Sequence, residues 1–428
     1  MKIFLKNVRA VDPLAGIDGT TDILIENGTI TRIAEELPKE LAEGAELIDC
    51  TGLCAIPGLF DMHVHWRDPG LTEKEDIFTG AAAAKAGGVT GVLLMPNTKP
   101  PVDNAETVKY ILDKGAETGI NVYTSACITK GMQSKELCDY DELIKAGVFC
   151  ITDDGKPVEN AELMRKALEL SVKNGLCVSS HCEDLNIING GIINKGRVSE
   201  TLGVKGMDRA SEDYITAREI ALAASCGAHV HICHVSTRGS VNIIRAAKKD
   251  GVNVTCETAP HYFTYTEEKL LSRDADYRMS PPLRTEDDRK AVEEALLDGT
   301  IDCIITDHAP HTAEQKADFL KAPNGVVGLE TSLAATLTHF YHSGKLGIAD
   351  IVRVMADNPR RILGLSPVRI AEGEMAELCI FDPDKKWTVD PGKLHSRSKN
   401  TVFKGETFTG KVVYTICGSA GIVYRPEE

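Results

Sequence analysis

The residues best suited to chemistry lie between Asp61 and Gly70, directly after an apolar run from Cys54 to Phe60. The run is typical of a buried strand, and side chains two apart on a strand point to the same face. His63 and His65 can therefore bind one ion together, and two imidazoles suit zinc. Arg67 continues this face and offers a planar fork that suits a carboxylate. An isolated His-x-His pair is at least as often structural as metal-binding. The residues at the ends of the other predicted strands must therefore decide between these two interpretations.

The middle of the chain alternates short apolar segments with helical patterns such as Ala161 to Leu170. Eight such units in a row predict an α/β fold, a TIM (β/α)8 barrel of the metal-dependent hydrolase type. An open doubly wound sheet usually has a Gly-rich phosphate loop after its first strand, and this sequence has none there. The predicted strands are Ala55–His65, Thr90–Asn97, Ile120–Ile128, Gly147–Asp154, Leu176–Cys182, His229–Ser236, Val252–His261 and Asp302–Pro310.

The ends of these strands carry histidines and carboxylates. Catalytic residues of a TIM barrel gather at the carboxyl ends of its strands, so these side chains are expected to meet. More ligands are available than one ion needs, which indicates a metal-assisted hydrolase with room for two ions. His261 ends the seventh predicted strand and is as well explained by the core as by the pocket. The strand ends are His63 and His65, Pro96-Asn97-Thr98, Asp153-Asp154-Gly155, His181-Cys182-Glu183, His234-Val235-Ser236, and Asp307-His308-Ala309-Pro310-His311.

Both ends of the chain have the short alternating runs and turns of β-hairpins. We expect residues 1–54 and 365–428 to form the two halves of one small β domain, with the barrel in residues 55–364. The net charge of -15 argues against binding to nucleic acid or to an acidic membrane surface. The 13 scattered cysteines and the absence of a signal-like start or a long apolar segment favour a cytoplasmic protein.

Several motifs, in order along almost the whole chain, resemble the type I bacterial dihydroorotases, in the cyclic amidase branch of the amidohydrolase superfamily. That resemblance implies a barrel with a small β domain built from both termini. The motifs are Pro57-Gly58-Leu59 with Asp61 to Gly70, Met95-Pro96-Asn97-Thr98, Thr152-Asp153-Asp154-Gly155, Ser180-His181-Cys182-Glu183, Cys233-His234-Val235-Ser236-Thr237, Pro281-Pro282-Leu283-Arg284 and Thr306-Asp307-His308-Ala309-Pro310-His311.

The resemblance also implies roles for single residues. Two Zn²⁺ ions per subunit are implied, bridged by Asp154 and a hydroxide. Asp307 is implied as the catalytic proton shuttle. The implied metal ligands are His63, His65 and Asp307 for one ion and His181 and His234 for the other, with Asp154 shared. The implied substrate contacts are His65, Arg67, Asn97, Ser280, His311, Asn324 and Gly325. Ser280 departs from the family, which usually has asparagine there; serine is shorter and offers one donor where the amide offers two.

The implied activity is the zinc-dependent, reversible hydrolysis of L-dihydroorotate to N-carbamoyl-L-aspartate in pyrimidine (UMP) biosynthesis. Hydantoinases and allantoinases are the main alternative, but they usually bridge their metals with a carboxylated lysine, and the segment from Gly147 to Asp154 contains no lysine. A non-catalytic partner subunit of a carbamoyltransferase would typically have lost metal ligands. A homo-oligomer, with a dimer favoured, and an aspartate carbamoyltransferase partner are also expected.

Overall fold

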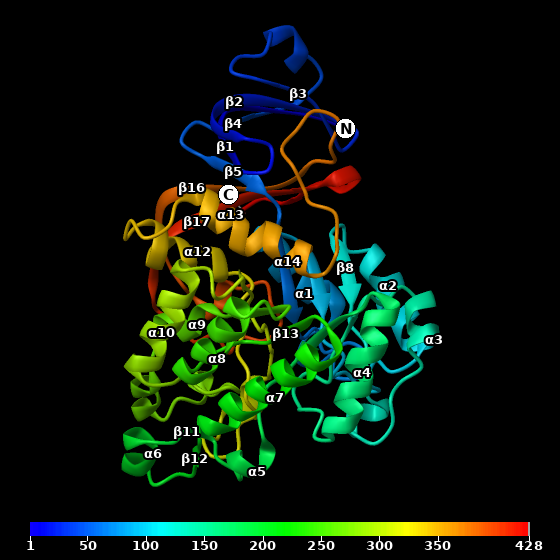
Figure 1. The fold of residues 1–428 in the computed structure, drawn as a ribbon. Coiled ribbons are helices and arrows are strands. Elements are labelled where there is room, and N and C mark those ends of the chain that lie inside the picture. Colours follow the sequence, from blue (N-terminus) through cyan, green and yellow to red (C-terminus); the bar gives the residue numbers. More distant parts are fainter. Residues whose placement is uncertain (427–428) are drawn as a thin grey trace.

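The computed structural model describes residues 1–426 and contains one large antiparallel-rich sheet and one ring of parallel strands surrounded by helices (Figure 1). The large sheet is formed by strands from both ends of the chain, as the sequence predicts. Its strands are β1 (Lys2–Asp12), β2 (Ile17–Glu26), β3 (Thr29–Ala34), β4 (Glu46–Asp49), β5 (Cys54–Pro57), β16 (Glu377–Thr388), β17 (Thr407–Cys417) and β18 (Gly421–Tyr424).

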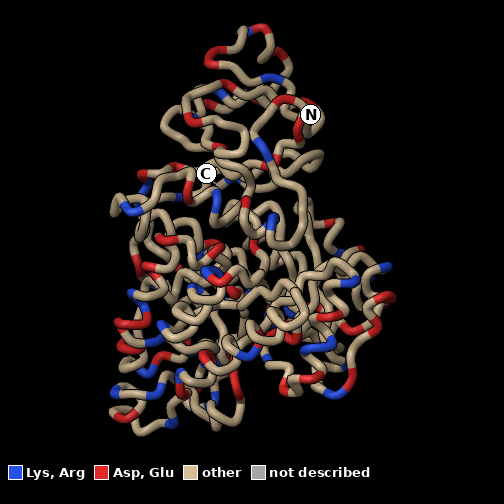
Figure 2. The backbone as a smooth tube through the Cα atoms, viewed as in Figure 1, with Lys and Arg blue, Asp and Glu red and all other residues tan. Residues whose placement is uncertain are grey.

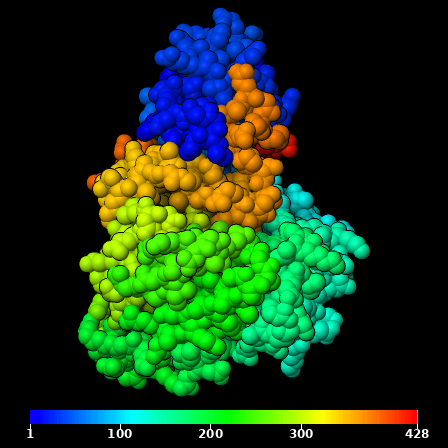
Figure 3. All heavy atoms as spheres, viewed as in Figure 1, coloured from blue at the N-terminus to red at the C-terminus, as the bar shows by residue number. Residues whose placement is uncertain are grey.

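The strand order of this terminal sheet is β18-β17-β16-β5-β1-β2-β3, with β4 beside β1. Alternating apolar residues set its register, since Ile3 lies opposite Ile25 and Leu5 opposite Ile23, all fully buried. In Figure 3 the blue N-terminal residues lie beside the orange segment, and Thr29 pairs there with Met375. The exact limits of the predicted β domain, 54/55 and 364/365, stay predictions.

The parallel strands form two sheets, β6-β7-β8 and β15-β14-β13-β10-β9. Two parallel bridges join these sheets at both edges, Ala126 with Ile151 and Val64 with His308, so that the eight strands form a ring. The predicted barrel fold is therefore present. Its strands are β6 (Leu59–Val64), β7 (Val89–Leu94), β8 (Asn121–Thr124), β9 (Cys150–Ile151), β10 (Cys177–Ser180), β13 (Val230–Ile232), β14 (Val254–Thr258) and β15 (Cys303–Ile304).

The segment from Ala55 to His65 forms two strands, where the sequence predicts one. β5 pairs with β16 in the terminal sheet, and β6 pairs with β7 in the barrel. The division falls at Gly58, where an added Cβ would lie only 2.2 Å from Oγ1 of Thr90. Only glycine leaves room for the Thr90 side chain this close to the backbone. The apolar run is continuous because both sheets bury it, which hides the boundary in the sequence.

Helices cover the outside of the ring. α4 illustrates how the sequence specifies them: Oδ1 of Asn160 accepts from two backbone N–H groups of the first turn, and Gly175 ends the helix with φ 68°. The helices are α1 (Ile77–Ala86), α2 (Ala105–Ala116), α3 (Tyr140–Lys145), α4 (Ala161–Asn174), α5 (Leu185–Ile188), α6 (Arg197–Leu202), α7 (Ala210–Cys226), α8 (Arg238–Lys249), α9 (Pro260–Thr264), α10 (Glu286–Leu297), α11 (Ala313–Lys316), α12 (Ser332–Thr336), α13 (Ile348–Val352) and α14 (Asn358–Ile362). A short pair, β11 (Ile193–Asn194) and β12 (Gly206–Met207), lies beside α5.

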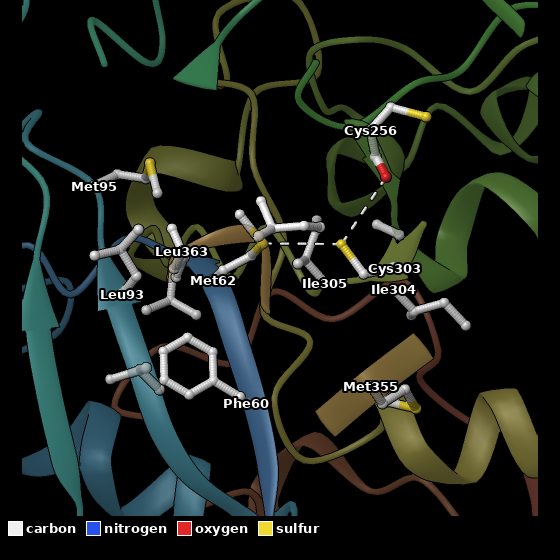
Figure 4. Close-up of a cluster of buried hydrophobic side chains, with 14 of the residues drawn as sticks. Phe60, Met62, Leu93, Met95, Cys256, Cys303, Ile304, Ile305, Met355 and Leu363 are labelled. Atoms are coloured by element: carbon white, nitrogen blue, oxygen red, sulfur yellow. Dashed lines mark hydrogen bonds between the residues drawn. The ribbon is translucent and has the colours of Figure 1, made fainter. Parts of the chain in front are cut away.

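The core of the ring is apolar and rich in sulfur. Figure 4 shows Met62 of β6 and Cys303 of β15 side by side, with their sulfur atoms 3.8 Å apart. Phe60 and Leu93 pack on the same side, and all four side chains are at most 2% exposed. This packing holds β6, and with it the histidines that follow, in a fixed place.

Positions with Lys or Arg and positions with Asp or Glu are distributed along the whole backbone in Figure 2, and the net charge is -15. Among the described helices there is none both long and apolar enough to span a membrane.

Candidate active site

The predicted site residues gather around one cavity of about 380 Å³, a volume suited to a small molecule. Leu185 of α5 and Met207 of β12 also line it, so its mouth faces the end of the molecule away from the terminal sheet (Figure 1). His63 is the one predicted residue that does not line the cavity, and it lies fully buried behind the wall. The others are His65, Arg67, Asn97, Asp154, His181, His234, Ser280, Asp307, His311, Asn324 and Gly325.

Asp154 lies at the centre of two ligand groups. Its Oδ1 is 3.4 Å from Nε2 of His63, and its Oδ2 is 3.3 Å from Nε2 of His65. On the other side, Oδ1 is 3.4 Å from Nδ1 of His181 and 3.5 Å from Nε2 of His234. One carboxylate thus borders both groups, which is the arrangement that a bridge between two ions requires.

Asp307 completes the first group from the opposite wall. Its Oδ1 is 3.0 Å from Nε2 of His65 and 3.7 Å from Nε2 of His63. Tetrahedral ligands about 2.1 Å from one zinc ion lie roughly 3.4 Å from each other. The separations between the nitrogen and oxygen atoms of this group are therefore closer to those of ligands around one ion than to those of mutual hydrogen bonds.

Two buried atoms support the same interpretation. Nε2 of His63 and Oδ1 of Asp154 have no hydrogen-bond partner within residues 1–426, although both are shielded from solvent. Leaving such atoms unsatisfied costs free energy, and a metal ion would satisfy both. The donor set of imidazoles and carboxylates suits zinc and similar ions, so the residues fit a metal centre.

The second nitrogen of three histidines is held by a neighbouring side chain. Nδ1 of His63 donates to Oε1 of Glu257 over 2.6 Å, and Nε2 of His181 donates to Oε2 of Glu183 over 2.8 Å. Because carboxylates only accept, these bonds leave Nε2 of His63 and Nδ1 of His181 free to bind a metal. Nδ1 of His65 is likewise 2.8 Å from Oδ1 of Asn97. Metal-binding histidines are usually oriented in this way.

The backbone is strained at two of the predicted ligands. His234 has φ 33° and Asp307 has φ 47°, in the left-handed region that residues other than glycine rarely adopt. Each follows a strand of the ring, β13 and β15, and the left-handed turn points its side chain into the mouth. Such conformations cost about 1–3 kcal/mol each and persist where the surrounding structure imposes them.

Electrostatics keep the two aspartates ionised. Burial alone would raise the pKa of Asp154, but the imidazoles of His63, His181 and His234 hold the pKa well below its usual range. The pKa of Asp307 is also lowered, because the close imidazole of His65 and the charges of the histidines outweigh burial. Both side chains are therefore carboxylates, able to bind a cation or to accept a proton.

Arg67 is the cation of the cavity wall. It is 8% exposed, and burial lowers its pKa to about 10. Nη1 is 3.5 Å from Oδ1 of Asn97, and Nε has no hydrogen-bond partner in the part of the chain that the structure describes. Trp66, next to Arg67, packs on Gly80 of α1, where an added Cβ would lie 2.5 Å from the indole ring. The close approach of α1 fixes the chain between His65 and Arg67.

His311 and the following loop close one side of the cavity. Nε2 of His311 donates to the carbonyl oxygen of Asn324 over 2.8 Å, and both residues and Gly325 line the cavity. Burial, followed by the charge of Arg67, lowers the pKa of His311, so the ring is neutral. Nζ of Lys316 ties this loop to the segment of Arg278, because it donates to the carbonyl oxygens of Arg278 and Pro323 over 3.1 and 3.0 Å.

The comparisons with known proteins agree with this geometry. The family model described as dihydro-orotase-like matches residues 52–240. A dihydroorotase of Trichlorobacter lovleyi is 46% identical to the chain over 420 residues, which is 98% of both proteins. The chain belongs to the dihydroorotase family. A second family member, from Geobacter sulfurreducens, is 48% identical over 429 residues, covering 99% of this chain and all of the relative.

As a member of the dihydroorotase family, the chain is a metal-dependent cyclic amidohydrolase. Its fold is shared more widely. An L-hydantoinase (dihydropyrimidinase) from Arthrobacter aurescens superposes with a TM-score of 0.86, covering 100% of this chain and 96% of the other at 24% identity. That likeness concerns the fold alone and agrees with the barrel predicted from the sequence.

Two residues that contact the predicted ligands, Glu257 and Glu183, have no role assigned to them in the sequence analysis. Glu257 lies within β14, and no local pattern marks it. Glu183 could have been found, because it follows His181 by two positions at a strand end. His261 stays between its two interpretations: it is buried but does not line the cavity, and its Nε2 lacks a partner in the described chain.

Proposed function

We propose that the protein catalyses the reversible hydrolysis of L-dihydroorotate to N-carbamoyl-L-aspartate, a step of pyrimidine biosynthesis. The observation that carries the proposal is the buried guanidinium of Arg67, whose Nε has no partner among the described residues. A buried cation costs free energy unless an anion pairs with it, and a substrate carboxylate would do so in a bidentate geometry. Dihydroorotate carries this carboxylate, whereas hydantoin and dihydrouracil do not.

Other residues of the cavity orient the ring. Asn97 accepts from His65 through Oδ1, which leaves its amide N–H groups to donate to the same substrate carboxylate. His311 contacts the substrate from the facing loop, and the backbone of Asn324 and Gly325 offers groups to the ring amide. Orientation of this kind can lower an activation barrier by several kcal/mol.

Asp307 moves the proton. Its pKa is lowered, so the carboxylate is ready to accept a proton from the attacking water at neutral pH. It then gives this proton to the ring nitrogen as the amide bond breaks. In the reverse direction, Asp307 takes the proton from the ureido nitrogen when the ring closes.

The proposed metals are two zinc ions. His63, His65 and Asp307 would hold one, His181 and His234 the other, and Asp154 both. Zinc supplies Lewis acidity, which lowers the pKa of bound water toward neutrality and polarises a carbonyl group. Support comes from the ligand separations of 3.0–3.7 Å and from the unpartnered Nε2 of His63.

A hydantoinase activity is the second candidate, because hydantoinases share the fold. Two features of this chain speak against it. First, the residue proposed to bridge the metals is Asp154, and the segment from Gly147 to Asp154 contains no lysine. Second, a ring without a carboxylate offers no anion that could pair with the guanidinium of Arg67.

The test is the initial rate of the zinc-loaded protein on L-dihydroorotate, hydantoin and dihydrouracil at equal concentrations. We expect turnover of dihydroorotate well ahead of both other rings. Equal or faster turnover of the uncarboxylated rings would reject the proposal in favour of a cyclic amidase with an aspartate bridge. No turnover of any ring by protein with zinc bound would indicate that a partner enzyme is required.

We further propose that the enzyme works in the cytoplasm as a homodimer, with an aspartate carbamoyltransferase as a possible partner. All 13 cysteines are free, and all but Cys226 are buried, which suits a reducing compartment. Light scattering of the purified protein, alone and with a carbamoyltransferase, tests the assembly.

A further inference from the structure

Ser280 lines the cavity, but its hydroxyl is already engaged. Oγ donates to Oε2 of Glu183 over 2.6 Å, and the same oxygen accepts from Nε2 of His181 over 2.8 Å. An O–H to carboxylate distance of about 2.5–2.7 Å is typical of a strong charge-assisted hydrogen bond. A chain of hydrogen bonds thus runs from Ser280 through Glu183 to an imidazole of the metal site.

Glu183 is the central link of this chain. It is 2% exposed, and two donors, Nε2 of His181 and Oγ of Ser280, both lie within hydrogen-bond distance of its Oε2. Its Oε1 has no hydrogen-bond partner in the described part of the chain, so the two bonds to Oε2 set its orientation.

The segment that carries Ser280 is itself held in place. The hydroxyl of Tyr262 donates to the carbonyl oxygen of Pro281 over 2.6 Å. Four residues after Ser280, the buried Arg284 donates to Oγ of Ser236 over 3.0 Å and to Oε2 of Glu212 over 3.2 Å. These anchors present the serine hydroxyl at a fixed position, so its bond to Glu183 needs little further ordering.

We propose that Ser280 is a positioning residue that acts through Glu183 on His181, and that it does not read the substrate ring. The inference deepens the proposed function and rests on its metal site. It explains why serine can stand at position 280, where the family usually has asparagine: the one hydroxyl donor of Ser280 bonds to Glu183. The ring is then recognised by the remaining wall, Arg67, Asn97 and His311.

The test compares Ser280→Ala and Ser280→Thr with the unchanged enzyme. Each protein is loaded with two equivalents of zinc, and the release of each equivalent to a chromophoric chelator is followed. His181 belongs to one of the two ligand groups, so Ser280→Ala should weaken one equivalent roughly tenfold and leave the other unchanged. Ser280→Thr keeps a hydroxyl and should restore retention. Ser332→Ala is the matched control, since Ser332 is buried and its hydroxyl has no partner within residues 1–426.

Kinetics on dihydroorotate then separate the two roles. A positioning role predicts a lower kcat for Ser280→Ala below zinc saturation, with KM within about twofold. Unchanged zinc release together with a tenfold higher KM would overturn the proposal and make Ser280 a substrate contact. Equal zinc loss in Ser280→Thr would also overturn it, because the hydroxyl would not be the cause. If the unchanged enzyme retains zinc but hydrolyses the uncarboxylated rings at least as fast as dihydroorotate, the proposed function fails while the zinc comparison still tests Ser280.

Discussion

Glu257 lies between two histidines in the interior of the barrel. Its Oε1 accepts from Nδ1 of His63 over 2.6 Å, and its Oε2 is 3.1 Å from Nε2 of His231. The carboxylate is 1% exposed, and the charges of both histidines help to lower its pKa against the effect of burial. A buried negative charge therefore fixes the proton of His63 on Nδ1 and makes Nε2 the atom that faces the metal site.

Glu257→Gln should weaken zinc binding roughly 10- to 100-fold. Glutamine keeps the shape of the side chain and an accepting oxygen but removes the charge that stabilises the tautomer and the bound cation. Competition with a chromophoric chelator measures the affinity. Glu377→Gln is the control, because Glu377 of β16 in the terminal sheet pairs with Arg360 of α14 and should leave zinc affinity unchanged. Equal zinc affinity in Glu257→Gln and the unchanged protein would refute this role.

Arg67→Met should mainly impair binding of the carboxylated substrate. Methionine fills a similar apolar volume but cannot form the bidentate bond, which costs about 3 kcal/mol or roughly a hundredfold in kcat/KM. Steady-state kinetics on dihydroorotate measure the loss, which should fall mostly on KM. Slow turnover of dihydrouracil, if any is measurable, provides an internal control and should change little. An unchanged KM for dihydroorotate would show that Arg67 does not bind the substrate carboxylate.

Asp307→Asn should lower kcat by about 10²- to 10⁴-fold, the range for loss of a general acid–base. Asparagine still bonds to His65 but cannot carry the proton. The assay needs excess zinc, and the zinc content of each sample separates lost chemistry from lost metal. A variant that binds zinc normally and keeps more than a tenth of kcat would show that another group moves the proton.

The clustering of the side chains at the site could be predicted, because catalytic residues of a barrel gather at the carboxyl ends of its strands. His63, His181 and Asp307 are far apart in sequence, yet His63 lies near the end of β6 and the other two follow β10 and β15. Parallel strands in a ring bring their carboxyl ends together. Glu257 could not be found in this way, because it lies inside β14 and contacts His63 across the barrel. The orientation of Ser280 was equally hidden, since it depends on Glu183 from a different strand end.

The division of the first predicted strand at Gly58 also depends on packing alone. Every residue of β5 and β6 is buried, and the two strands follow each other in one mostly apolar stretch of sequence. No change in hydrophobic periodicity therefore marks the boundary between them. The division is visible only in the tertiary structure, where the Thr90 side chain of β7 packs against the backbone of Gly58.

Gly80→Ala should destabilise the protein by about 1–3 kcal/mol, the usual cost of overpacking. Alanine in a helix is normally worth about 0.5–1 kcal/mol in stability, so the sign of the effect decides between helix propensity and the contact with Trp66. Urea unfolding measures it. Gly19→Ala is the control, because an added Cβ there meets no atom within 4 Å. A more stable Gly80→Ala protein would mean that α1 can move away from Trp66 without cost.

Lys316 should make stability depend on pH. Burial lowers its pKa from 10.5 to about 7, and the charged groups that face it are Asp274, Asp276, Arg278 and Lys404. Between about pH 7 and pH 10 the unfolded chain therefore binds the proton that the folded chain lacks. Stability then rises with pH across this window, and below it the folded protein keeps a buried charge at a constant cost.

Lys316→Met removes the group while keeping its apolar stem, so the unfolding free energy of the unchanged protein minus that of the variant should increase from pH 7 to pH 10. Urea unfolding at both pH values measures the difference, and Lys321→Met, at an exposed position nearby, is the control. A difference that stays constant or falls with pH would show that Lys316 remains charged in the fold.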